Sequence, residues 1–153
     1  MQQNDPNITL ITATAPLSAA THGGRAKCLQ RLIRLDLPVP CTVALSFDAV
    51  HAIAAGNMLD MQAILTAFDT DDLLCVRPSS EDPDWGGPRA ILNIGMNDNR
   101  YQALRSQLGH EAAAGLYIRF VQSYAVHVAR LDPDMFDTSA AFGPQELAQA
   151  LQA

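Results

Sequence analysis

The chain has 153 residues, of which 48% are hydrophobic and 17% charged, and its formal net charge is −6. This length, together with this proportion of hydrophobic to charged residues, is typical of one folded globular domain, residues 1–153, and excludes a disordered chain. The negative charge argues against a nucleic-acid partner, because proteins that bind nucleic acids usually present a basic surface.

The three cysteines, Cys28, Cys41 and Cys75, lie far apart in the sequence and form no CxxC pair. They predict small, buried thiols in a reducing cytosol, and neither a metal site nor a disulfide framework. The first residues show no basic region followed by an apolar stretch, and no apolar run approaches the ~20 residues that span a bilayer. We therefore expect a cytoplasmic protein with no membrane partner.

The first half of the chain shows two strand patterns and three helical patterns. In chain order we expect a strand over 8–13, a helix over 25–37, a strand over 42–45, and helices over 48–55 and 58–68. The first helix ends near Leu37 because Pro38 and Pro40 cannot continue it. Ser46 is a suitable N-cap for the next helix.

The second half begins with a strand over 73–77 and a long polar loop over 78–88. Helical periodicity then predicts helices over 98–108 and 109–131, with a short helix over 145–151 in a C-terminal extension, residues 132–153. This order of elements predicts an α+β fold, with a small mixed sheet and packed helices.

Gly23 and Gly24 precede a basic helix in which Arg25 and Lys27 are the first cationic residues. The first turn of a helix has backbone N–H groups without partners, and glycine lets an anion approach them closely. The pattern fits a phosphate site, yet it is neither a P-loop nor a dinucleotide motif. The alternative is an ordinary loop that enters a surface helix with a solvated basic face.

Arg77 ends an otherwise apolar strand, and a guanidinium there can hold a phosphate through two parallel hydrogen bonds. The alternative is an ion pair with a nearby acid, such as Asp71, Asp72 or Glu81. His22, beside the glycine pair, faces a bound phosphate in one interpretation and is an exposed loop histidine in the other.

Four segments, 23–40, 73–79, 91–98 and 117–124, resemble the start of the nucleotide-binding domain of the pyruvate phosphate dikinase family, in the same order and with compatible spacing. The resemblance covers about residues 8–137. Phosphoenolpyruvate synthase and rifampicin phosphotransferase are related enzymes. The resemblance implies the first subdomain of an ATP-grasp fold, in which ATP with Mg²⁺ phosphorylates a histidine on a separate domain.

The resemblance also implies site residues. Gly23, Gly24 and Arg25 stand where the family has Gly-Gly-Lys, and Arg77 stands where the family has a strand-end arginine. In the family these residues serve the ATP phosphates. Gly86 aligns with a glycine of the family's methionine-rich loop, so we expect Gly86 and Gly87 to be possible loop contacts.

The departures from the family limit the activity that we expect. Arg25 replaces a lysine, Arg89 and Ala90 replace an aspartate and a threonine, and the chain covers only the first half of the domain. We expect an ATP- or phosphate-binding module that is incomplete for phosphoryl transfer by itself, without catalytic or metal-binding residues of its own. Another protein chain or a second protomer would complete it. The alternatives are a non-catalytic binding or regulatory scaffold, and one fragment of a longer product.

Overall fold

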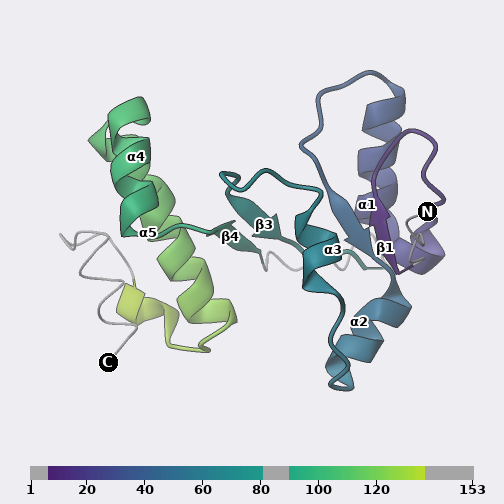
Figure 1. Cartoon of the computed structure of the whole chain (residues 1–153). Coiled ribbons are helices and arrows are strands. Elements are labelled where there is room, and N and C mark those ends of the chain that lie inside the picture. Colours follow the sequence, from purple (N-terminus) through teal and green to yellow (C-terminus); the bar gives the residue numbers. More distant parts are fainter. Residues whose placement is uncertain (1–6, 81–89, 137–153) are drawn as a thin grey trace. The chain divides into compact units, whose positions relative to one another are not determined.

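The computed structural model describes residues 7–80 and 90–136, which divide into two compact units (Figure 1). In the described part of the chain, unit 1 comprises residues 7–70 and 78–80, and unit 2 comprises residues 71–77 and 90–136. Each unit has its own hydrophobic core.

Unit 1 has five elements in the order β1 (Ile8–Leu10), α1 (Ala19–Arg34), β2 (Val43–Leu45), α2 (Phe47–Ala54) and α3 (Met61–Leu65). β1 and β2 form an antiparallel pair, with Ile8 opposite Leu45 and Leu10 opposite Val43. Helix α1 packs against β2 and α2. The buried apolar centre of this unit is small, and consists of Ile11, Leu17 and Ala26.

A buried amide holds the loop before α1 in place. Gln30 is fully buried, and its Nε2 donates hydrogen bonds to the Thr12 carbonyl at 3.1 Å and the Ala15 carbonyl at 2.7 Å. Its Oε1 accepts a hydrogen bond from Lys27 Nζ at 2.8 Å. Because buried polar groups are costly without partners, this network fixes the path of the chain into α1.

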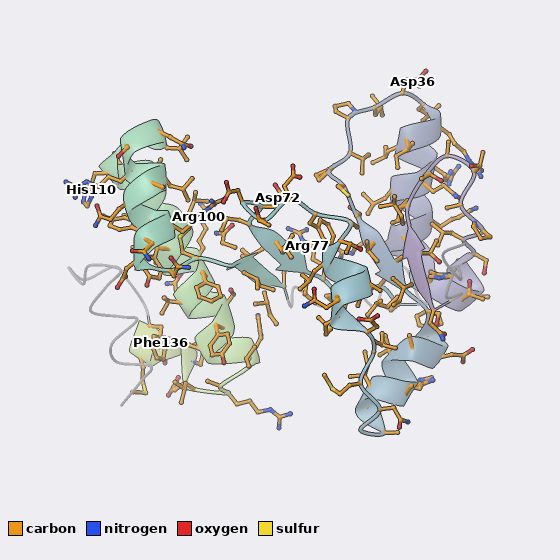
Figure 2. All side chains as sticks on the ribbon, viewed as in Figure 1. Asp36, Asp72, Arg77, Arg100, His110 and Phe136 are labelled. Atoms are coloured by element: carbon orange, nitrogen blue, oxygen red, sulfur yellow. The ribbon has the colours of Figure 1, made fainter. Side chains whose placement is uncertain are left out.

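Unit 2 has five elements in the order β3 (Leu74–Val76), β4 (Ile91–Ile94), α4 (Asp98–Leu108), α5 (His110–His127) and the 3₁₀ turn η1 (Pro133–Phe136). β3 and β4 pair antiparallel with an irregular register. Helix α5 packs against β4, α4 and η1. Figure 2 shows Phe136 beside α5, where its ring is buried.

Two hydrogen bonds from donors on β4 to acceptors on α5 attach the strand to the helix. Asn93 Nδ2 donates to the Leu116 carbonyl at 2.9 Å, and the Leu92 N–H donates to Ser123 Oγ at 3.0 Å. Asn93 has a φ of 54°, a left-handed conformation that asparagine tolerates better than most residues. These bonds keep a short two-stranded sheet, which would be marginal alone, in place on the helix.

Two tyrosines connect α4 and α5. The Tyr117 hydroxyl donates to Asp98 Oδ1 at 3.0 Å, and the Tyr101 hydroxyl lies 2.9 Å from His110 Nδ1. The two tyrosine rings are in contact, with centroids 5.9 Å apart. Burial, followed by the hydrogen bond and charge of Asp98, raises the pKa of Tyr117 to about 12.

The structure confirms the α+β class and corrects the sheet. The described residues form two separate antiparallel pairs, in place of the one small mixed sheet that the sequence predicts. Strand β4 was not predicted, and helix α1 begins at Ala19, before the predicted start at residue 25. Ser46 is the N-cap of α2, as expected, because its Oγ accepts the Ala49 N–H at 3.1 Å.

The prediction of buried cysteines is wrong, because Cys28, Cys41 and Cys75 are all exposed and free. Cys28 lies on an exposed part of α1, and Cys75 lies on an exposed part of β3. At such positions the apolar character of a thiol does not decide which way the side chain faces. The predicted helix over 145–151 lies outside the described residues.

Candidate functional site

The glycine pair lies at a break within α1. Gly23 has φ 82° and ψ 164°, so the helical path is interrupted there and starts again at Gly24. Ser18 caps the first part, since its Oγ accepts the Thr21 N–H at 3.1 Å. A φ in this range is open to glycine and strained for other residues, which gives Gly23 a conformational reason for its identity.

The restarted helix meets the segment that follows Arg77 in the chain. The Gly24 N–H donates to the Ser80 carbonyl at 2.9 Å, and the Ala26 N–H donates to Ser79 Oγ at 3.4 Å. A Cβ on Gly23 would collide with Ser79, coming within 2.7 Å of its carbonyl carbon. Two segments about fifty residues apart in the sequence therefore form one corner of unit 1, which we call the glycine corner: residues 23–26 with Ser79 and Ser80.

This geometry changes how an anion can be held at the glycine corner. The amides of Gly24 and Ala26 already have acceptors within the protein, so a phosphate cannot take both without displacing Ser79 and Ser80. The Arg25 side chain is exposed at the start of the resumed helix. The exposed Arg25 side chain therefore remains open to a ligand.

Lys27 does not join Arg25 in a common cationic patch. Its Nζ donates to the Leu17 carbonyl at 3.1 Å and to Gln30 Oε1, so the only lysine of the chain supports the loop before α1. Arg34, further along the helix, donates from Nε to the Ala13 carbonyl at 2.7 Å. Two of the four cations in this helix thus stabilise the backbone of unit 1.

His22 is buried, with 5% of its surface exposed, so the interpretation as an exposed loop histidine is wrong. Its Nδ1 lies 2.8 Å from Thr21 Oγ1, and its buried Nε2 has no hydrogen-bond partner among the described residues. Burial lowers the pKa of this imidazole from its ordinary value of 6.5. The neutral ring is therefore favoured beside the glycine corner.

Arg77, labelled in Figure 2, follows the last residue of β3, and its side chain is exposed. Its Nε lies 3.4 Å from Cys75 Sγ. Of the acids suggested as its partners, Asp71 instead pairs with Arg100 at 2.6 Å, and Glu81 lies outside the described residues. Arg77 belongs to unit 2, while Gly23, Gly24 and Arg25 belong to unit 1. Their convergence on one ligand stays a prediction.

The remaining predicted contacts, Gly86 and Gly87, lie outside the described residues. Within residues 7–80 and 90–136, no cluster of His, Cys, Asp or Glu has the composition of a metal site. In the same residues, none of the helices combines the length and apolar character that a membrane crossing needs.

Sequence reasoning missed Ser79 and Ser80 as parts of the corner. Their contact with the glycine pair is non-local, and the only sequence signal for it was the glycine at position 23, which indicates a close approach of some backbone segment. Comparison of the chain with known proteins found neither a matching family model nor a matching curated protein. The resemblance to the dikinase family therefore stays a prediction.

Proposed function

We propose that the chain is a phosphate-binding module for ATP or a similar polyphosphate, related to the first ATP-grasp subdomain of the pyruvate phosphate dikinase family and incomplete for phosphoryl transfer by itself. The observation that carries the proposal is the exposed Arg25 side chain at the glycine corner. Residues 23–26 hydrogen-bond the segment 79–80, and Arg77 precedes Ser79 by two positions in the chain.

In this proposal, arginine side chains bind the phosphate oxygens. Arg25 is exposed beside a backbone that packs too tightly to admit a side chain at position 23. A guanidinium can offer two parallel N–H donors to a phosphate and stays charged at every physiological pH. Arg77 would supply the second guanidinium, since both arginines lie within segments that resemble phosphate-binding segments of the family.

The described residues offer groups that can bind the phosphates of ATP, but no acidic cluster that can bind Mg²⁺. Arg25, Arg77 and the Ser79 hydroxyl fit phosphate chemistry, while Mg²⁺ would arrive with the nucleotide, because the described residues hold no acidic cluster for it. Phosphoryl transfer needs metal, in-line positioning and charge neutralisation together. A second chain or protomer would therefore have to supply the groups that act on the terminal phosphate.

One observation favours a second candidate, a non-catalytic scaffold that kept the fold and lost nucleotide binding. The N–H groups of Gly24 and Ala26 already donate to Ser80 and Ser79. In that candidate the glycine pair serves only the packing of unit 1, and Arg25 is a solvated surface residue.

Isothermal titration of the full chain with ATP and Mg²⁺ separates the two candidates. We expect saturable binding that weakens about tenfold or more in Arg25→Ala and in Arg77→Ala, since each removes charged hydrogen bonds to phosphate. Arg31→Ala is the matched control, because Arg31 is an exposed arginine on the same helix. Absence of binding at millimolar ATP, or an equal loss in Arg31→Ala, would support the scaffold.

A further inference from the structure

Unit 1 exposes a run of large apolar side chains on α2, α3 and the loop between them. The residues are Val50, Ile53, Met58, Met61 and Leu65. We call this set the α2–α3 apolar surface. Met58 is the most exposed, with 79% of its surface accessible, and Met61 is 48% exposed. Val50 and Ile53 are three positions apart in α2, and Met61 and Leu65 are four apart in α3, so each pair shares a side of its helix.

The sequence of α2 is too apolar for a helix that faces solvent. Its residues Phe47–Ala54 include only two polar side chains, Asp48 and His51, yet Ala49 is its only buried residue. Helix α3 has no buried residue. A helix that is apolar nearly all round is normally covered, so these exposed apolar side chains of α2 and α3 indicate a binding site.

The segment that carries this surface has charges of one sign. Residues 35–70 contain no Lys or Arg, and all four of their acids are exposed: Asp36, Asp48, Asp60 and Asp69. Two of these acids flank the apolar side chains directly. Asp48 lies in the first turn of α2, and the Asp60 carboxylate caps α3 by accepting the N–H groups of Gln62 and Ala63 at 3.0 and 3.2 Å. An apolar surface flanked by these two acids is complementary to a cationic amphipathic partner.

We infer that the α2–α3 apolar surface binds an amphipathic helix of another protein, with leucine-like residues on one face and Lys or Arg along its edges. The two methionines suit such a partner, because their unbranched side chains adapt to different apolar shapes. Recognition of this kind uses apolar anchors at helical spacing. This binding is independent of the phosphate site.

The charges argue against two other partners for this surface, a second copy of this chain and an anionic lipid surface. In a symmetric pair of this chain, the same surface would face itself, which would bring Asp48 and Asp60 of both copies together and cost electrostatic energy. An anionic lipid surface would repel the same carboxylates. A cationic helix gains both from apolar burial and from charge attraction.

The test uses the full chain and a synthetic helical peptide of about 18 residues, with Leu on one face and Lys on the other. Fluorescence anisotropy should show binding that weakens as salt rises from 0.05 to 0.5 M. We expect the double variant Met58→Gln, Met61→Gln to bind about tenfold more weakly or worse, because a polar amide replaces the buried thioether contacts. Met135→Gln is the matched control, since Met135 is 72% exposed and belongs to unit 2.

A second measurement does not depend on variants. In a spectrum of methyl-labelled methionines, the Met58 and Met61 signals should shift on peptide addition and the Met135 signal should stay in place. A peptide with Glu in place of Lys should not bind. The inference is wrong if the Lys peptide fails to bind at about 1 mM, or if Met135→Gln weakens binding equally. Self-association lost in the double variant, or Met58 and Met61 methyls already shielded in the free chain, would overturn it as well.

Discussion

Gly23 packs so closely against Ser79 that no side chain fits between them. A Cβ at position 23 would lie 2.7 Å from the Ser79 carbonyl carbon, while the next residue, Gly24, donates its N–H to the Ser80 carbonyl at 2.9 Å. The break in α1 and the segment after Arg77 are therefore parts of one arrangement. The glycine pair, which the sequence indicates as an anion site, has a packing role in any case.

Gly23→Ala should destabilise the protein by roughly 2–4 kcal/mol, because it adds a steric clash to the strain of a positive φ. Gly56→Ala is the matched control, since Gly56 has φ 91° and nothing within 4 Å of the position of a Cβ. It should cost only about 1 kcal/mol, from the backbone alone. Urea unfolding monitored by circular dichroism measures both, and equal losses would contradict the close contact with Ser79.

Gln30→Leu should lower the free energy of unfolding by roughly 2–4 kcal/mol, although leucine is apolar and similar in size. The variant leaves the Thr12 and Ala15 carbonyls and Lys27 Nζ without their buried partner. Gln107→Leu, at an exposed position of α4, should change stability by less than about 0.5 kcal/mol. A neutral or stabilising effect of Gln30→Leu would show that the amide network does not hold the loop.

Stability should fall at alkaline pH because of Tyr117. The fold raises its pKa from 10.0 to about 12, so the folded state favours the neutral phenol. The sign follows from linkage: the contribution is complete below pH 10 and is lost as the pH rises from 10 toward 12. Tyr117→Phe should flatten this part of the stability profile, measured by urea unfolding. Tyr124→Phe, at an exposed ring, should leave it unchanged.

Stability should also fall in mild acid because of His22. Burial lowers its pKa below 6.5, so the unfolded chain binds a proton more readily than the folded one. The free energy of unfolding should therefore decrease as the pH falls below 6.5, down to the lowered pKa of the folded state. His22→Asn should reduce this dependence, while His51→Asn, at an exposed position, should keep it. An unchanged slope in His22→Asn would mean that the imidazole is solvated.

Most helix positions were predictable because local signals define them, although α1 begins earlier than predicted and α3 is shorter than the predicted helix over 58–68. Asn97 and Ser46 cap helices through their side chains, and Gly109 separates α4 from α5 near the predicted boundary. Strand β4 was not predicted, because its four residues are all half-buried and show no alternation. It depends instead on bonds to α5, such as that of Asn93 to Leu116, which a sequence does not reveal.

The candidate site was predictable only in part. A glycine pair before a basic helix predicted a backbone that an anion can approach closely, and in the structure Ser79 makes the close approach to Gly23. The sequence could not show that Ser80 and Ser79 accept hydrogen bonds from the N–H groups of Gly24 and Ala26, because that contact joins distant parts of the chain. It also could not show that Lys27 Nζ donates hydrogen bonds to Gln30 and to the Leu17 carbonyl. Helical spacing predicts the side of the helix on which a residue lies, but it does not identify the group that the side chain contacts.

The most direct test of the phosphate proposal is a titration of the ¹⁵N-labelled full chain with ATP and Mg²⁺, followed by amide and arginine side-chain signals. We predict that the Arg25 and Arg77 signals and the Gly24 amide shift together with one saturation curve, and that inorganic triphosphate reproduces these shifts. No shift at millimolar ATP, or a shift of Arg25 without Arg77, would contradict the account.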